Sequence, residues 1–364
     1  MTNRTEPTIM LQQLLDNLVN EQAAIRSGIL LIDSPDLCWQ GAAGLADPEI
    51  GLTADPADAF LIDSMAKMMT ATLVMKLIEA GRIHLEDPVG KFLDAKILDG
   101  LKDSNGAPFG ETVTIKHLLS HRSGLADDWN EPGFFDLIVA DPGKHWTPEE
   151  TIEFVKVNCQ PKFPPGEGFQ YSDPGYNMLG LIIESVTGKS LHEFSRAMLF
   201  EPLGMNHTYR PSHEDSRPSL SSREPSRRYL QDMECTAIPA VMTADWAGGG
   251  LISTTEDLNR FLRAFVCGDL FVNAETRDLM LQWQRTSDFT YYGFGVSRVN
   301  YAESDNPEQH ALGEIWGHTG SSHNFMYYWP SRDTTMIGTL NQMVTETQLY
   351  DTVARIMQVL IDEA

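Results

Sequence analysis

Apolar residues recur every three to four positions over residues 9–19, with polar residues between them. This spacing gathers the apolar side chains on one face and predicts an amphipathic helix. Two short apolar runs follow, at residues 28–33 and 37–42, and the turn-forming sequence Ser-Pro-Asp at 34–36 separates them. The pattern predicts a β-hairpin directly after the first helix.

The strongest helical signal covers residues 65–80, which are apolar on nearly every side and are followed by Gly81. Such a helix is expected to be buried on most faces, and glycine commonly follows a helix end. Weaker patterns predict helices at residues 117–120, 147–158, 176–186, 255–266 and 346–361. Runs of β-forming residues predict strands at residues 292–299, 323–329 and 335–340.

This order of elements predicts an α/β (α+β) fold in which both ends of the chain form one antiparallel sheet. The terminal helices would flank the sheet, and an all-helical domain would be inserted between its two halves. We expect residues 1–60 and 290–364 to form the sheet domain and residues 61–289 the helical domain. An irregular surface loop is expected near residues 210–246, which are rich in Ser, Pro and Arg.

Composition excludes several classes of function. The chain has 364 residues, of which 42% are hydrophobic and 21% charged, as in ordinary globular proteins. A formal net charge of −24 argues against nucleic acid as a partner. The charge is consistent with solubility, with adaptation to salt, or with a field that attracts cationic substrates. The sequence does not predict the oligomeric state.

The sequence carries no signal of a metal site, a cofactor site or a membrane segment. The four cysteines have neither zinc-site nor disulfide spacing, and the histidines form no metal-ligand motif, so we expect no metal and no cofactor. Outside the three motifs below, the histidines are assigned structural roles. No run is apolar enough to span a membrane, and the first residues lack an export signal pattern. These features predict a cytoplasmic protein without a membrane partner.

Ser64 and Lys67 are the first candidates for chemistry. They stand three residues apart at the start of the apolar helix, so their side chains share one face. A serine hydroxyl needs a base to become a nucleophile, and a lysine in a low-dielectric site can have its pKa lowered enough to act as one. The alternative is an N-cap serine followed by a surface lysine, and the Ser-x-x-Lys spacing alone does not exclude it.

Two further motifs carry candidate residues. Tyr171, in Tyr-Ser-Asp, lies in a loop and could exchange protons if a lysine were close, although tyrosines more often pack with a hydrogen-bonded tip. His318 begins His-Thr-Gly, where the small residues Thr319 and Gly320 let a strand edge approach the nucleophile. The alternative for His-Thr-Gly is a tight turn that enters a strand.

The order Ser-x-x-Lys, Tyr-Ser-Asp, His-Thr-Gly resembles the penicillin-recognising serine hydrolases of the class C β-lactamase type. That family includes β-lactamase-like esterases, DD-carboxypeptidases, D-aminopeptidases and D-amino acid amidases. The resemblance runs from about residue 28 to the C-terminus. It also includes non-catalytic stretches at residues 117–125, 163–167, 171–180, 201–205 and 248–257.

The resemblance implies a role for each motif residue. Ser64 would form the acyl-enzyme, Lys67 and Tyr171 would share proton transfer, and His318 would replace a lysine that β-lactamases often carry there. The backbone N–H groups of Ser64 and Ser321 would form the oxyanion hole. The substrate-binding positions would be Asp173, Thr319, Gly320, His323 and Trp246. The pocket walls would come from the loops at residues 126–146, 210–246 and 285–312, with Trp129 and Tyr291 as further candidates.

Asp173 departs from the family pattern, because the third position of the middle motif is commonly Asn. A carboxylate only accepts hydrogen bonds, whereas an amide also donates them. Asp173 could pair with Lys67 and keep it charged, or it could hold the amine of a cationic substrate. The departure weakens an assignment as a β-lactamase.

The resemblance implies a serine hydrolase that cleaves an ester or amide of a small molecule through an acyl-enzyme, and esterase-like activity is favoured. The alternatives are a D-amino acid amidase, a D-aminopeptidase or DD-peptidase-like activity. An acyltransferase that uses the same site, or a non-catalytic binding module on this scaffold, also remains open.

Overall fold

The computed structural model describes residues 5–211, 213, 223–230, 232–236, 238–343 and 346–362. The helices, in chain order, are α1 (Thr5–Glu21), α2 (Ala66–Glu79), α3 (Ala95–Leu98), α4 (Phe109–Thr112), α5 (Ile115–Leu119), α6 (Pro132–Ala140), α7 (Pro148–Asn158), α8 (Asp173–Thr187), α9 (Leu191–Ser195), α10 (Pro239–Ala244), α11 (Thr255–Cys267), α12 (Ala274–Met280) and α13 (Glu346–Asp362). The strands are β1 (Ser27–Asp33), β2 (Cys38–Asp47), β3 (Leu52–Thr53), β4 (Phe60–Leu61), β5 (Tyr229–Leu230), β6 (Met233–Glu234), β7 (Ile252–Ser253), β8 (Gln284–Arg285), β9 (Thr290–Tyr292), β10 (Ser297–Asn300), β11 (Glu314–Gly320), β12 (Asn324–Trp329) and β13 (Thr334–Thr339).

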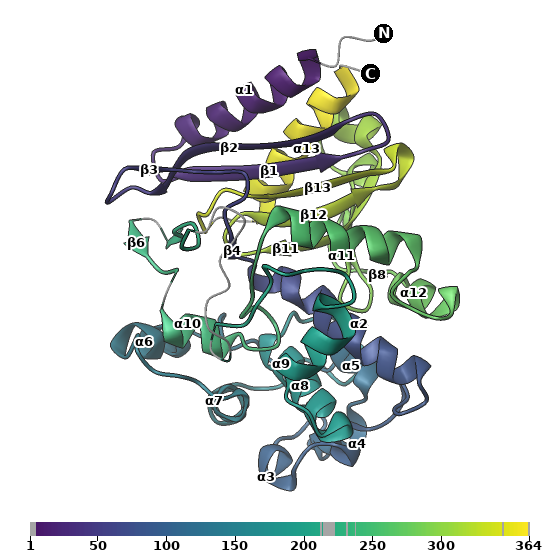
Figure 1. Cartoon of the computed structure of the whole chain (residues 1–364). Coiled ribbons are helices and arrows are strands. Elements are labelled where there is room, and N and C mark those ends of the chain that lie inside the picture. The colour runs from purple at the N-terminus through teal and green to yellow at the C-terminus, as the bar shows by residue number, and fades with distance from the viewer. Residues whose placement is uncertain are drawn as a thin grey trace.

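One antiparallel sheet joins the two ends of the chain. Within the described part of the chain it has nine strands in the order β3-β2-β1-β13-β12-β11-β10-β9-β8. The join is the pairing of β1 with β13, in which Leu30 lies opposite Gly338. Because β13 separates β1 from β12, the N-terminal hairpin is held in the sheet only by a strand from near the other end of the sequence (Figure 1).

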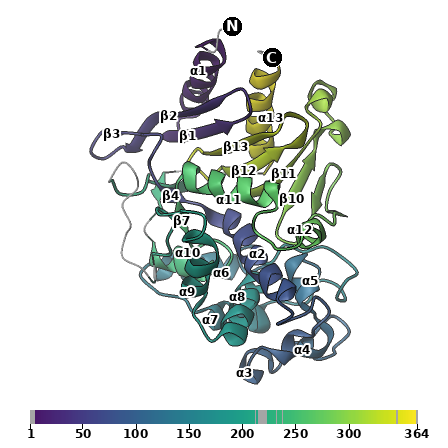
Figure 2. The same cartoon turned by 45° about the vertical axis from the view of Figure 1, so that its right-hand side comes forward.

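The two faces of the sheet pack against different helices (Figure 2). Side chains alternate between faces along a strand. On β1, Leu30 and Ile32 pack in a core with α1 and α13, whereas Ile29 and Leu31 pack in a larger core with α2. Helix α11 covers this second face and contacts β1, β12 and β13. We call the side of α1 and α13 the outer face, and the opposite side the inner face.

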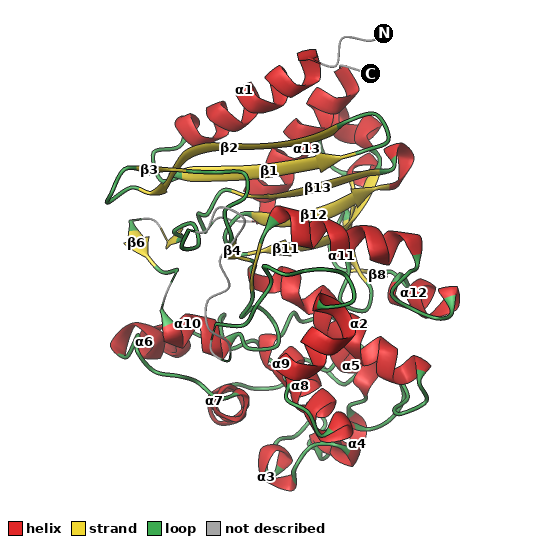
Figure 3. Ribbon diagram, viewed as in Figure 1, coloured by secondary structure: helices red, strands yellow, loops and turns green. Residues whose placement is uncertain are grey.

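The remaining helices form a layer next to the inner face (Figure 3). Helix α2 lies between the sheet and this layer and contacts α8, α9 and β11. It is buried along most of its length, as its apolar sequence predicts. Among the described residues, no helix is both long and apolar enough to cross a lipid bilayer.

The predicted architecture is confirmed: an antiparallel sheet built from both ends of the chain, terminal helices on one face and a helical layer on the other. The N-terminal hairpin, the buried helix that follows Ser64 and the last helix all lie where they were predicted. The domain boundaries at residues 60 and 290 remain a prediction.

Two predictions of local structure need correction, and one alternative is excluded. The strand predicted at 292–299 is two strands, β9 and β10, because the chain turns at Gly295 with a φ of +72°. The alternative of a tight turn at His-Thr-Gly does not hold, because His318 is part of strand β11 and the turn follows it. Part of the loop predicted at 210–246 lies outside the described residues, and its described part contains the β5–β6 hairpin and α10.

Candidate functional site

Ser64 lies in a short 3-10 turn, Asp63–Met65, that leads into α2. Asp63 has a left-handed backbone with a φ of +47°, which is uncommon outside glycine. Its buried carboxylate accepts hydrogen bonds of 2.9 Å from the backbone N–H of Ser322 and from Nδ2 of Asn324, and it forms an ion pair with Arg228. These contacts hold the turn that carries Ser64 against the end of β11 and the start of β12.

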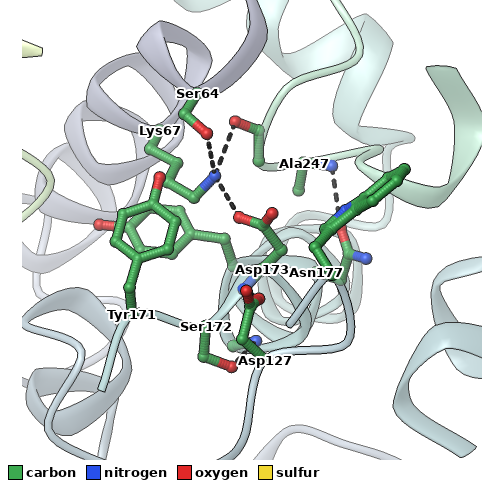
Figure 4. A network of polar contacts seen from close by, with 12 residues as sticks. Ser64, Lys67, Asp127, Tyr171, Ser172, Asp173, Asn177 and Ala247 are labelled. Carbon is green, nitrogen blue, oxygen red and sulfur yellow. Dashed lines mark hydrogen bonds and ion pairs between the residues drawn. The ribbon is translucent and has the colours of Figure 1, made fainter. Parts of the chain in front are cut away.

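Lys67 is completely buried one helical turn after Ser64 (Figure 4). Its Nζ donates hydrogen bonds to Oγ of Ser64, at 2.9 Å, and to the carbonyl oxygen of Gly248, at 3.2 Å, and it forms an ion pair with Asp173. Burial lowers the pKa of Lys67, but the neighbouring acidic groups raise it more, Asp173 first, and the pKa ends well above the ordinary lysine value. Lys67 is therefore an ammonium ion before substrate binds.

Tyr171 completes a three-way contact with Ser64 and Lys67. Ser64 and Lys67 both lower the pKa of its phenol, and Nζ of Lys67 lies 4.9 Å from the centre of its ring. Burial raises the pKa of Tyr171, and the opposing effect of Lys67 does not reverse this shift. The resting site therefore contains a neutral phenol and a charged lysine.

His318 lies on β11 and faces the same cavity as Ser64. Its Nδ1 donates to the carbonyl oxygen of Thr319 at 2.7 Å, so its Nε2 accepts from the hydroxyl of Tyr292 at 3.0 Å. Burial lowers the pKa of His318 to about 3. The imidazole is therefore neutral at physiological pH and cannot act as a permanent positive charge.

The end of β11 passes very close to the turn of Ser64. A Cβ at Gly320 would lie 2.8 Å from the carbonyl oxygen of Ile62 and 2.9 Å from Cβ of Asp63, closer than side chains approach one another. A glycine is therefore needed at this point. The close approach brings Ser321 into the cavity beside Ser64, where Thr319 and Gly320 also form part of the lining.

Asp173 is the first residue of α8. The sequence left open whether it pairs with Lys67 or holds a substrate amine, and its position favours the first role. Its side chain pairs with Lys67, and its backbone N–H donates to Oδ1 of Asp127 at 3.0 Å. Burial, together with Asp173, raises the pKa of Asp127 to about 7. The pKa values of Asp128 and Asp245 are raised well above the ordinary aspartate value, first by burial and then by their acidic neighbours.

Among the described residues, the carboxylates of Asp127, Asp128 and Asp173 have oxygens within 4.8 Å of one another, a spacing that a cation could use. Two features compete with a cation there. Asp173 already binds Lys67, and the raised pKa values of Asp127 and Asp128 favour their protonated forms. We therefore assign no metal to this group.

His121 is a residue to which sequence reasoning gave only a structural role. It has a left-handed backbone, and its Nδ1 accepts a hydrogen bond from the backbone N–H of Ser172 at 3.1 Å. Its buried ring lies 4.2 Å, centre to centre, from that of Tyr171 and 4.8 Å from that of Tyr292. His121 therefore fixes the loop that carries Tyr171. No local sequence signal distinguishes it from an ordinary buried histidine.

Two predicted pocket residues lie elsewhere among the described residues. His323 follows β11 with a φ of +58°, which directs its side chain toward the outer face, where Nε2 hydrogen-bonds Oγ1 of Thr352 at 2.8 Å. Trp246 is buried in the inner core, with its ring so close to Gly180 that a Cβ there would lie 2.6 Å from it. Neither residue contributes to the described lining of the cavity.

The cavity that contains Ser64 has a volume of about 900 Å³. Its lining includes both Trp129 and Tyr291, which the sequence suggested. The described lining residues come mainly from around α6, from the β5–β6 hairpin and α10, and from β8 to β10. These segments overlap the three loops in which pocket walls were expected.

Comparisons with known proteins agree with this geometry. The model of the family described as Beta-lactamase matches residues 11–359. Penicillin-binding protein 4* of Bacillus subtilis is 27% identical over 338 residues, which cover 90% of this chain and 68% of that protein. The chain spans 60%, 47% and 44% of the length of three further curated relatives.

Two solved structures show the same fold. D-amino acid amidase from Ochrobactrum anthropi SV3, complexed with D-phenylalanine, is similar with a TM-score of 0.81 at 21% identity, over 99% of this chain and all of that one. EstCE1, described as a hydrolase with promiscuous acyltransferase activity, is similar with a TM-score of 0.73 at 17% identity, over 96% and 98% of the two chains.

An antiparallel sheet with helices on both faces, and a serine and a lysine at the head of a buried helix, define the class of β-lactamase-fold serine hydrolases. The match to the family model covers nearly the whole sequence. The chain belongs to the β-lactamase family.

Proposed function

We propose that the protein hydrolyses esters of small molecules through an acyl-enzyme formed on Ser64. The hydrogen bond of 2.9 Å between Nζ of Lys67 and Oγ of Ser64 carries this proposal. Oγ would attack the carbonyl carbon, and the oxyanion would be held by the N–H groups of Ser64 and Ser321. Water would then release the acid and restore the serine.

The contacts of Lys67 favour one route for the proton of Ser64. Lys67 is already charged and Tyr171 is already protonated, so neither can accept a proton without losing one. Asp173 is in direct contact with Nζ on the side away from Ser64 (Figure 4). We propose that Lys67 passes one proton to Asp173 while it receives the proton of Ser64, so that the carboxylate is the final acceptor. Tyr171 would orient Oγ and give its proton to the leaving group, which departs as the alcohol. The water that attacks the acyl-enzyme would return a proton to Tyr171, and Asp173 would return one through Lys67 to Oγ.

A second candidate is the hydrolysis of amides or esters that carry a free amine, as in D-amino acid derivatives. Asp245 supports it. Asp245 lines the cavity, and its Oδ1 has no hydrogen-bond partner among the described residues. The nearby cations Lys67 and Arg228 already pair with Asp173 and Asp63. Burial raises the pKa of Asp245, but an ammonium placed beside it would favour its ionised form. A substrate ammonium could therefore pair with Asp245, a role that the sequence had suggested for Asp173.

One set of assays tests both candidates. We expect p-nitrophenyl butyrate to be hydrolysed faster than D-alanine p-nitroanilide or a chromogenic cephalosporin. We also expect a fluorophosphonate to add to Ser64, as detected by mass spectrometry. The Ser64→Ala variant should lose both the turnover and the adduct. A preference for D-alanine p-nitroanilide that Asp245→Asn abolishes would favour the second candidate. Absence of an adduct and of all turnover would contradict both.

A further inference from the structure

One helix supplies an apolar wall to the cavity that contains Ser64. Phe135, Ile138 and Val139 of α6 all line this cavity. Their spacing of three and four residues places them on a single face of the helix. Leu137 lies on the same helix and is exposed, but it does not contribute to the described lining. Helix α6 is thus apolar on more than one face, and the face of Phe135, Ile138 and Val139 is the one that lines the cavity.

Segments next to α6 continue this apolar lining, and Ile238 and Val241 pack in the same cluster as Ile138. Ile238 and Val241 contribute from the start of α10 and from its first turns, and Leu230 and Met233 contribute from the two strands of the β5–β6 hairpin. We call the whole set the apolar arm; its described members are Trp129, Phe135, Ile138, Val139, Pro142, Leu230, Met233, Ile238 and Val241. Every member of the arm has an apolar side chain.

Charged groups occupy a different part of the same cavity. The acidic and basic residues of the described lining are Asp63, Asp173, Arg228 and Asp245. Arg228 forms an ion pair with Asp63, which lies in the turn of Ser64. Asp173 forms an ion pair with Lys67. The cavity therefore has a polar end at the nucleophile and an apolar end along α6, which is the arrangement expected of a site for an amphipathic ligand.

The apolar arm reaches the surface. Nine large apolar side chains are exposed among the described residues, and three of them, Phe135, Val139 and Met233, line this one cavity. Their exposed fractions are 38%, 52% and 41%. Exposed apolar groups that gather at the mouth of a cavity are characteristic of ligand-binding sites. In water these groups gain from being covered by an apolar ligand.

We infer that the substrate carries a flexible alkyl chain or a bulky aryl group that lies in the apolar arm while its ester group reaches Ser64. This inference rests on the proposed hydrolysis at Ser64 and names the class of substrate for that site. A cavity of about 900 Å³ is large enough for a ligand far larger than an acetate ester. The preferred substrates are thus esters of medium or long chain length.

The test is a pair of chain-length series. The first varies the acyl group, from p-nitrophenyl acetate through butyrate and hexanoate to octanoate, below the concentrations at which the esters aggregate. The second varies the alcohol, from ethyl to butyl and hexyl acetate, followed by titration of the released acid. Burial of each methylene should raise kcat/KM about twofold to fourfold along the series whose variable group enters the apolar arm.

Two variants of α6 locate the effect. Val139→Asp places a charge in the arm, and Leu137→Asp places the same charge on the same helix outside it, at a side chain of similar exposure. Val139→Asp should lower the ratio of long-chain to acetate kcat/KM at least fivefold, and Leu137→Asp should leave that ratio unchanged. The shortest ester of each series is the reference within each variant, so a general loss of activity cancels from the chain-length ratio.

The outcomes separate this inference from the proposed function. The protein could hydrolyse acetate esters with a need for Ser64 while kcat/KM does not rise along either series. That result would overturn the inference about the apolar arm and leave the proposed hydrolase function standing. Equal effects of Val139→Asp and Leu137→Asp on the chain-length ratio would also overturn it. Loss of all ester turnover in the wild-type protein would instead contradict the proposed function. A gain along one series that Val139→Asp removes would support the inference.

Discussion

The two faces of the sheet differ in the kind of residue that they bury. On the outer face, α1 and α13 cover an apolar core in which buried polar tips bond neutral groups, as Trp329 does with the carbonyl oxygen of Leu312. On the inner face, at the site, charged groups are buried together, as Lys67 is with Asp173. Burial of ionised groups is unfavourable unless they are paired. The outer face therefore stabilises the fold, whereas the buried charges of the site lower its stability and are retained for their chemistry.

The largest effect that this comparison predicts is on the buried ion pair. The double variant Lys67→Met with Asp173→Asn should lower kcat/KM on an ester about 10²-fold to 10⁴-fold, because it removes the proton-transfer groups. Its free energy of unfolding, measured in urea, should stay equal to that of the wild type or rise, since replacing both members of a buried pair is often neutral or stabilising.

The single variant Lys67→Met is the matched control for stability. It leaves Asp173 buried without its cation, so it should be less stable than the double variant. A double variant that unfolds much more easily than the wild type would show that the pair stabilises the fold, and the contrast between the two faces would be lost.

A smaller effect, on stability alone, is expected on the outer face. Leu15 of α1 is 1% exposed and packs against β1. Leu15→Ala should lower the free energy of unfolding by about 2–5 kcal/mol while kcat/KM stays within about twofold, because the cavity it leaves lies on the far side of the sheet. Ile9 lies on the same helix and is 50% exposed, so Ile9→Ala should change stability much less. A parallel loss of activity in folded Leu15→Ala would contradict the separation of the two faces.

The third prediction concerns pH and the role of Asp173. The pKa of Lys67 is held well above its ordinary value, so the lysine keeps its proton through neutral pH. If Asp173 is the final proton acceptor, the kcat/KM of the wild type should change little between pH 6 and pH 9. In Asp173→Asn the pKa of Lys67 falls, the neutral lysine must act as base, and kcat/KM should rise with pH over that range, from about a tenth of the wild-type value at pH 7.

Whether Asp173 is the final proton acceptor is decided by measuring kcat/KM against pH for both proteins. Folding is checked by circular dichroism at each pH. Identical profiles would remove Asp173 from the path of the proton. A wild-type profile that itself rises steeply with pH would indicate that neutral Lys67 is already the base.

The sequence predicted the parts of this molecule that depend on local pattern. The period of the apolar residues located α1, α2 and α13, and runs of β-forming residues located β12 and β13. The motif residues Ser64, Lys67 and Tyr171 could be named because the order of their motifs resembles one enzyme family, and the structure brings all three together.

What could not be predicted depends on contacts between distant segments. Asp63 and Arg228 form an ion pair across a large separation in sequence, and nothing in either local sequence marks them. The direction of His323 depends on a left-handed backbone that no apolar pattern encodes, so its assignment to the pocket failed. The choice between two roles for Asp173 required the position of Nζ of Lys67, which only the packing of α8 against α2 provides.

The place of β13 in the sheet has a consequence for how the protein is made. This strand lies between β1 and β12, although it is the last strand in the described part of the sequence. A growing polypeptide therefore carries the helix of Ser64 long before the strand that joins β1 to the rest of the sheet leaves the ribosome. Contacts between such distant segments form slowly. Ser64 should thus stay unreactive throughout synthesis and become reactive only when the sheet closes.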